Sequence, residues 1–256
     1  MTDRTRTALA VASVLSLALL AQASQAQAGL AIQSSTVGGV PTGVAYAGFN
    51  DLALGSAGGW SLASNGQSIQ VHFGGDAAAV QGAVGGINAA PYLSNNNGAA
   101  FGTPNGADGS TYLTTGSASN VAGALVELVF PSAEKYLGLL WGSVDSYNFL
   151  DFHGANGLIG TIGGNDVTNS ANGDQGAQGT YYVNITSDEA FTRVVARSNG
   201  YAFEFDNLAF NPTSPNGDPV PEPMTLSLLA AALLGLGFAV RRRHDAARRA
   251  VPRCGE

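Results

Sequence analysis

The sequence predicts an all-β protein, an antiparallel β-sandwich of jelly-roll-like type, with an N-terminal signal peptide and one C-terminal transmembrane helix. Short runs in which apolar and polar residues alternate predict half-buried strands. Glycine-containing dipeptides separate these runs and predict tight turns. Each end of the chain has an uncharged apolar stretch next to arginines, as targeting and membrane segments do.

The composition limits the class of protein. The chain has 256 residues, 35 of them glycine, and 11% are charged. A helical bundle would be richer in Leu, Glu and Lys, and a disordered chain would lack the apolar clusters. About 190 residues remain between the terminal segments, which is enough for one large all-β domain.

Charge is distributed unevenly along the chain. Between residues 29 and 219, three basic residues stand against 14 carboxylates, a net charge of −11, and the other eight basic residues lie near the ends. Such an acidic body repels phosphate backbones, so we expect no nucleic-acid partner. The single cysteine, Cys254, excludes an internal disulfide and a thiolate metal site.

Residues 1–28 have the three parts of a signal peptide for Sec-type export. Two arginines precede an apolar stretch, and Ala26 and Ala28 form the small-x-small cleavage pattern. Residues 21–23 offer a competing cleavage pattern. An uncleaved anchor is the alternative, but the apolar stretch is short for a membrane span.

The strands of the body are predicted by period-two patterns over residues 29–210. Residues 68–73, 181–186 and 203–206 alternate apolar and polar side chains, as half-buried antiparallel strands do. Residues 125–130 and 137–141 are more continuously apolar, as central strands would be. Roughly nine strands are expected, with no sustained helical period.

Two segments of the body differ from this pattern. Residues 76–119 are rich in Ala, Gly and Asn and predict a long loop packed over the sandwich. Residues 211–219 are rich in Pro, Asn and Gly and predict a stiff, exposed linker.

The C-terminal part predicts a membrane span. Residues 224–240 carry no charge, and 17 helical residues reach about 25 Å, near the lower limit for a bilayer. Arg241, Arg242 and Arg243 follow and would stay in the cytoplasm, which leaves the body outside and residues 241–256 inside. A buried core helix is the alternative, but such a helix is not usually followed by six arginines.

A proline-rich motif precedes this span. Val220, Pro221, Glu222 and Pro223 form an extended strip, because proline fixes the backbone and removes hydrogen-bond donors. The motif, the apolar helix and the arginine cluster together resemble the PEP-CTERM sorting signal of Gram-negative bacteria. The resemblance implies cleavage by a membrane-embedded exosortase, a transient stay in the inner membrane, and transfer to the cell surface or extracellular matrix. This tail runs on to Glu256, further past the arginines than is usual for such tails.

The second half of the body resembles a family of exosortase-dependent surface proteins. The resemblance rests on a Trp-Gly-Ser-Val-Asp-Ser-Tyr-Asn segment at 141–148, on 163–167, and on a Phe-Glu-Phe-Asp-Asn strand at 203–207. It covers about residues 120–210 well and the first half only loosely. It implies location and fold more than activity.

Oxygen-bearing side chains at the expected strand ends predict a calcium or glycan site. Ca²⁺ prefers carboxylate and amide oxygens, but Asp and Asn also favour turns for conformational reasons, so both interpretations stay open. No twelve-residue calcium loop is present, no metal ligand set is firm, and no other cofactor is expected. A tyrosine ring among these residues is expected to be exposed and to suit stacking against a sugar. The predicted site comprises Asp145, Tyr147, Asn148, Asp166, Asp206 and Asn207.

Carboxylates also allow a hydrolase hypothesis. Glu204 and Asp206 share one face of a strand, and Asp145 or Asp151 nearby would complete a pair of glycosidase type. The alternative is that these groups cap strands, bond turns or face solvent. Serine-hydrolase, zinc and phosphate-loop motifs are absent from the sequence, so we predict no catalytic residues and no enzyme.

Several aromatic residues could offer rings to sugars, although aromatics are more often core or edge residues. These are Trp60, Trp141, Tyr147, Tyr181 and Tyr182. The leading functional hypothesis is a non-catalytic surface or matrix protein linked to extracellular polysaccharide. The alternatives are a calcium-dependent carbohydrate-binding module and, less favoured, a glycan-active hydrolase.

Overall fold

The computed structural model describes residues 29–34, 42–94, 106–116 and 124–215. The signal peptide, the Pro-Glu-Pro motif, the apolar C-terminal segment and the arginine cluster lie outside the described residues. Within the described ranges, no helix is long and apolar enough to cross a membrane.

The described chain is all-β, as predicted, with one helix of four residues, α2 (Gly164–Val167). All pairings between its strands are antiparallel. The strands are β1 (Leu30–Ser34), β2 (Ala45–Ala47), β3 (Gly59–Leu62), β4 (Ser68–Gly74), β5 (Ala78–Val80), β6 (Tyr92–Leu93), β7 (Gly106–Ala107), β8 (Tyr112–Thr114), β9 (Leu125–Gly142), β10 (Asn148–Gly154), β11 (Gly157–Gly163), β12 (Tyr181–Ser198) and β13 (Glu204–Asn211).

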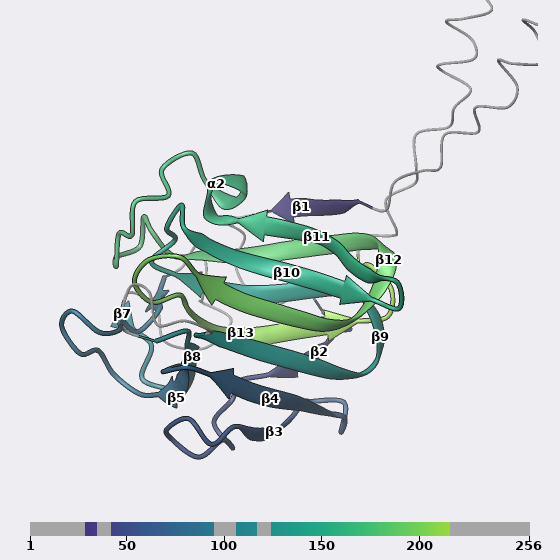
Figure 1. The fold of residues 1–256 in the computed structure, drawn as a ribbon, viewed down its shortest axis with the longest axis horizontal. Helices are drawn as coiled ribbons and strands as arrows, with labels where there is room; N and C mark the ends of the chain where they lie inside the picture. Colours follow the sequence, from purple (N-terminus) through teal and green to yellow (C-terminus); the bar gives the residue numbers. More distant parts are fainter. Residues whose placement is uncertain (1–28, 35–41, 95–105, 117–123, 216–256) are drawn as a thin grey trace, which may run out of the picture. The chain divides into compact units, whose positions relative to one another are not determined.

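The strands β9 and β12 organise the fold, because each has 18 residues and takes part in two layers (Figure 1). The first half of β9 pairs with β4 and with the end of β12. Its second half pairs with β13 and with the start of β12. The register between β9 and β12 shifts near Glu134 and Phe191, where both strands pass from one layer to the other.

The strands other than β6 and β7 form one hydrogen-bonded sheet of 11 strands. It folds over along β9 and β12 into two layers that share these long strands, called here the first and the second sheet. The first sheet has the order β3-β4-β9-β12-β10-β11. The second has the order β1-β12-β9-β13, with β2 and β8 beside β13 and β5 beside β8. This is an antiparallel β-sandwich, as predicted; a jelly-roll strand order stays a prediction.

The core lies between the two sheets and draws apolar side chains from both. Val126 and Leu128 of the first sheet and Leu139 of the second belong to one buried cluster. Trp141 stacks on Phe203 with 4.4 Å between ring centroids. Offset and edge contacts between aromatic rings add to the apolar area that they bury, so the aromatic residues fix how the sheets pack.

The period-two pattern predicted which side chains face this core. In β4, Ile69 and Val71 are buried while His72 is exposed. In β13, Phe203 just before the strand and Phe205 within it belong to the core cluster. At residues 181–186 the alternation places Val183 and Ile185 in the core cluster, as predicted. The strand is not half-buried, however, because Tyr182, Asn184 and Thr186 on its other side are buried as well.

Three expectations about the strands are corrected. The runs 125–130 and 137–141 are two halves of the single strand β9, which continues through Pro131 and Ser132 although both residues favour turns. Thirteen strands, rather than nine, occur in the described residues. Residues 76–119 are not only a loop: short strands there extend the second sheet and form the small β6-β7 pair. Each of these strands has only two or three residues, too few to show a periodic pattern.

Candidate functional site

The structure contains a cavity of about 370 Å³ beside the start of β13, called here the polar cavity. It is formed by the segment after β9, the segment before β12, the residues around the start of β13, and the loop 83–89. The side chains that its chemistry depends on are Val84, Ile87, Ser143, Asp145, Tyr147, Asn172, Gln175, Tyr201 and Glu204.

Asp145 is held on one wall of the cavity by two glycines. Gly173 has a φ of +73°, and a Cβ there would lie 2.8 Å from the Asp145 carboxylate oxygens. Gly164, at the start of α2, packs so closely that a Cβ would lie 2.0 Å from the Asp145 carbonyl oxygen. The Gly173 amide donates to the Val144 carbonyl at 3.0 Å. Residues with side chains would not fit at these two positions, so the Gly-Gly and Asn-Gly segments of the sequence position Asp145.

Tyr147 lies half-buried against another glycine. A Cβ on Gly200 would lie 2.6 Å from the ring of Tyr147, so only glycine lets the ring adopt this position without a shift. Burial raises the pKa of Tyr147 above its usual value, and its hydrogen bond with Asp145 raises it further. Burial also raises the pKa of Asp145, although the hydrogen bond from Tyr147 lowers it.

Glu204 forms the floor of the cavity and is only 3% exposed. Its Oε1 accepts a hydrogen bond from the Ala89 amide at 2.9 Å, and its Oε2 accepts one from the Ser143 hydroxyl at 2.7 Å. Burial raises the pKa of Glu204 to about 7, although these bonds and a further backbone bond lower it. The charge of Asp145 also raises it, so the two carboxylates sense each other across the cavity. Glu204 therefore joins the loop 83–89 to the end of β9.

The lining is polar inside and apolar at its rim. Val84, Ile87 and Tyr201 are among the exposed large hydrophobic residues, with 50%, 47% and 58% of their surface accessible, and all three line the cavity. Ser143, Asn172 and Gln175 add hydroxyl and amide groups. No lysine, arginine or histidine is among the lining residues. A ligand with hydroxyl groups and an apolar face matches this lining better than an anion does.

The predicted calcium or glycan residues do not form one site. Asp145 and Tyr147 line the polar cavity, but Asn148, Asp166, Asp206 and Asn207 do not. Asn148 is fully buried at the start of β10, and its side-chain atoms bond no described residue. Asp166 accepts a hydrogen bond from the Gly163 amide at 2.8 Å and thereby caps α2. Asp206 and Asn207 are buried elsewhere on β13.

Of the carboxylates considered for a glycosidase pair, the structure brings only Asp145 and Glu204 into one cavity. Glu204 and Asp206 lie on the side of β13 opposite to the core residue Phe205, as predicted, but both are buried rather than exposed. Asp145 shares the cavity with Glu204. Asp151 lies on the outer side of β10 and pairs with Arg197, so it takes no part in the cavity.

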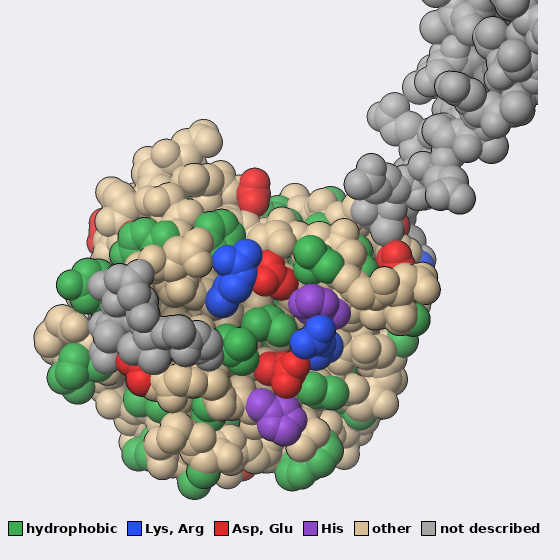
Figure 2. Space-filling view, viewed as in Figure 1, with side chains coloured by type: hydrophobic (Ala, Val, Ile, Leu, Met, Phe, Trp, Pro, Cys, Tyr) green, Lys and Arg blue, Asp and Glu red, His purple; other side chains and the backbone are tan. Residues whose placement is uncertain are grey.

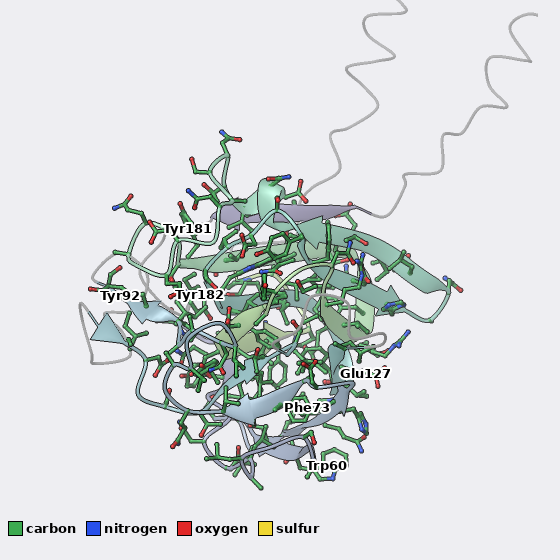
Figure 3. All side chains as sticks on the ribbon, turned by 60° about the vertical axis from the view of Figure 1, so that its left-hand side comes forward. Trp60, Phe73, Tyr92, Glu127, Tyr181 and Tyr182 are labelled. Carbon is green, nitrogen blue, oxygen red and sulfur yellow. The ribbon has the colours of Figure 1, made fainter. Side chains whose placement is uncertain are left out.

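The aromatic residues considered for sugar stacking lie far apart. Trp141 is fully buried and so offers no ring to a sugar, and Tyr182 is buried as well. Trp60 is 61% exposed on β3, whereas Tyr181 and Tyr182 lie across the molecule from it (Figure 3). These rings therefore form no common platform, and Tyr147 alone among them lines the cavity.

The outer side of the first sheet carries alternating charged and histidine side chains (Figure 2). Arg197 bonds both oxygens of Asp151, at 2.6 and 3.2 Å, and its guanidinium lies 4.5 Å from the Phe149 ring centroid. Arg193 bonds Glu127 at 2.8 Å. These side chains neutralise one another, so we call this surface the paired face.

Sequence reasoning missed part of the cavity. The loop 83–89 and Gln175 carry no motif, so nothing in the sequence marked them. Tyr201 follows the Asn199-Gly200 turn, a signal that could have placed it at a strand end. Among the described residues, no group of three His, Cys, Asp or Glu side chains gathers as a metal site.

Comparisons with known proteins add little. No protein-family model matches the chain, and no curated protein matches it. Among solved structures, a mutant of CBM29-2, a family 29 carbohydrate-binding module, is similar at 14% identity. The similarity covers 77% of this chain and 99% of that one, with a TM-score of 0.25. A similarity this weak supports no conclusion about function.

Proposed function

We propose that this protein is an exported surface or matrix protein whose body binds a neutral polysaccharide in the polar cavity without cleaving it. The single observation that carries the binding proposal is the lining, which combines an exposed tyrosine and two apolar residues at the rim with carboxylate, amide and hydroxyl groups inside. Small-molecule sites commonly have volumes of ~300–1,000 Å³ and a few placed polar groups, and the cavity meets both criteria.

The class of sugar follows from charge and shape. The C–H face of a sugar ring can pack on Tyr201 while its hydroxyls donate to Asp145 and accept from Asn172 or Gln175. With two carboxylates and no cation among the lining residues, the cavity would repel a uronic acid or a sulfated sugar. Neutral or amino sugars are therefore the expected ligands.

A glycan-active hydrolase is the second candidate. Two carboxylates in one cavity, one of them with a pKa of about 7, favour it. However, both oxygens of Glu204 already accept hydrogen bonds from the protein, so Glu204 ties loops together rather than presenting a free acid to a glycosidic oxygen. We therefore favour binding without turnover.

Sorting through the tail is a proposal from the sequence alone. The signal peptide pattern, the Pro221-Glu222-Pro223 motif, the apolar segment and the arginines support it, and so does an acidic body suited to the cell exterior. Exosortase and the export machinery would be its partners.

Binding can be tested with a panel of neutral, amino and anionic polysaccharides, together with Tyr201→Ala and the surface control Leu158→Ala. We expect neutral or amino glycans to bind the unaltered protein and the control, and Tyr201→Ala to weaken binding about tenfold, as loss of one stacking ring would. Equal binding by both variants would rule out the cavity, and release of reducing ends would favour the hydrolase.

Sorting can be tested by fractionating a native host with an epitope tag inserted in the 211–219 linker. In the unaltered chain we expect the tagged body at the surface or in the matrix, without its tail. Pro221→Ala with Pro223→Ala should retain the full-length chain in the inner membrane. An unchanged size and location in that double variant would contradict exosortase sorting.

A further inference from the structure

Two carboxylates meet in a buried position that the polar cavity does not include. Asp206 lies on β13 and is fully buried, and Asp108 follows β7 and is 5% exposed. The Ser110 hydroxyl contacts both: it lies 3.0 Å from Asp206 Oδ2 and within hydrogen-bond reach of Asp108 Oδ1. A hydroxyl has one hydrogen, so while both carboxylates are ionised one of these two oxygen–oxygen contacts has no hydrogen between its atoms. The side chains of Asp206 and Asp108 also lie within hydrogen-bond reach of each other.

The pair also lacks a compensating charge. Asp206 Oδ1 is buried and accepts no hydrogen bond. The groups that bond Asp206 or act on its charge are Asp108, Ser110 and Asn207, none of which is basic. Arg193 and Arg197 are engaged on the paired face of the other sheet. Burying a carboxylate without a partner is costly, so a positive species should lie between the two groups.

Asn207 and Tyr46 lie beside the same position. The Asn207 amide nitrogen donates to Asp108 Oδ2 at 3.4 Å, and the Tyr46 hydroxyl donates to Asn207 Oδ1. The charges of Asp206 and Asp108 both act on Tyr46, which places that hydroxyl beside the pair. Neither nitrogen ligands nor thiolates are present among these five residues. The carboxylate oxygens of Asp108 and Asp206 and the hydroxyl oxygen of Ser110 suit a hard divalent cation, and Ca²⁺ accepts such irregular sets more readily than Mg²⁺.

The local backbone explains why these groups converge. The pairing of β13 with β9 shifts by one residue between Asp206 and Ala209, and Asn207 in this bulge has a φ of +56°. Because of this extra residue, the side chains of Asp206 and Asn207 both lie outside the core cluster, while Phe205 and Leu208 belong to it. Asparagine is one of the few residues that adopt this conformation readily.

We propose that Asp108, Ser110 and Asp206 bind one Ca²⁺ ion that ties the segment after β7 to β13. The ion neutralises both carboxylates and satisfies Asp206 Oδ1. The Asp108 amide donates to the Pro91 carbonyl at 2.8 Å, so the ion also steadies the chain that leads away from the loop 83–89. This site is separate from the polar cavity and does not depend on glycan binding.

The test uses the full chain as exported, first treated with a chelator and then dialysed. Calorimetric titration with CaCl₂ should show one Ca²⁺ per chain, and saturating Ca²⁺ should raise the thermal unfolding midpoint by several degrees, because a ligand that binds only the folded state stabilises it. MgCl₂ at the same concentration should raise it less.

Asp206→Asn and Asp108→Asn should each abolish the calcium-dependent shift, whereas the exposed control Asp188→Asn should keep it. Should both site variants fail to fold, Ser110→Ala keeps both carboxylates and should weaken Ca²⁺ binding about tenfold. An unaltered protein that binds no Ca²⁺ and unfolds at the same temperature with and without chelator would overturn the proposal. A proton shared by the pair would then be the positive species.

Discussion

The two sheets carry ionisable groups on their outer sides in opposite ways. On the paired face of the first sheet, each arginine has a carboxylate partner, and the pairs are partly exposed. On the outer side of β13 in the second sheet, Glu204 and Asp206 are buried, and the groups that bond them or act on their charge include no cation. Exposed ion pairs contribute little to the stability of a fold, whereas burying a carboxylate without a cation lowers that stability. Such carboxylates are retained only where hydrogen bonds or a ligand offset the cost of burying them. We therefore assign both candidate sites to the second sheet, which carries Glu204 and Asp206.

The largest effect on stability, and the sharpest test of this difference between the sheets, is expected from a substitution of Glu204. Glu204→Ala removes the acceptor of the Ala89 amide and the Ser143 hydroxyl and leaves both donors buried. We expect the free energy of unfolding to fall by about 2–3 kcal/mol. Asp151→Ala, on the paired face, should cost less than ~1 kcal/mol. Urea unfolding of the two variants measures both, and equal losses would contradict the comparison.

Gly200 offers the next largest effect. In Gly200→Ala the new Cβ would overlap the Tyr147 ring, so the ring must move within the cavity. We expect the affinity for a neutral glycan to fall about tenfold, or ~1.4 kcal/mol, with a smaller change in stability. Gly106→Ala, where a Cβ meets no atom within 4 Å, is the matched control. Unchanged affinity in Gly200→Ala would remove Tyr147 from the binding site.

The paired face should show a small acid dependence. Burial raises the pKa of Asp151, but hydrogen bonds from Arg197 and Thr161 and the charge of Arg197 outweigh it, and the pKa is lowered. The stabilisation is therefore present above the unfolded pKa of about 3.9 and is lost as the pH falls through the lower folded value.

Because Arg197 is partly exposed, solvent should limit this effect to less than ~1 kcal/mol. The stability difference between the unaltered protein and Asp151→Asn should be largest above pH ~5 and shrink below pH ~4. A difference that stays constant between pH 6 and pH 3 would show that the ion pair does not stabilise the fold.

The smallest effect is expected at Trp60. This residue is 61% exposed on β3 and is not among the residues that line the cavity, so Trp60→Ala should change the free energy of unfolding by no more than about 0.5 kcal/mol. Glycan binding should also stay the same. Loss of glycan binding in this variant would move the binding surface to the first sheet.

Much of the fold was predictable from local patterns. The alternation at 68–73 and 203–206 predicted which side chains enter the core, because a strand sends successive side chains to opposite sides. The burial of Trp141 followed from its apolar run. The passage of β9 and β12 between two sheets was not predictable, because it depends on pairings between residues 40 or more positions apart.

The candidate sites were predictable only in part. Asp145 and Tyr147 do line the cavity, but Asp166 caps a helix and Asn148 lies in the interior. The loop 83–89, Ser110 and Asp108 carry no recognisable motif, although they complete the two sites. The terminal segments that predict export and sorting lie outside the described residues, so those predictions stand on the sequence.

The sequence by itself determined an all-β body with an acidic surface, and it predicted the targeting segments at both ends. Periodicity, charge count and terminal motifs are local properties of the chain, so they can be read without a tertiary structure. The tertiary structure alone decided which of many Asp and Asn residues meet. A turn aspartate and a ligand aspartate have the same local sequence, and they differ in the distant segment that packs against them. Asp108 and Asp206 stand 98 positions apart in the chain and share one hydroxyl in the fold.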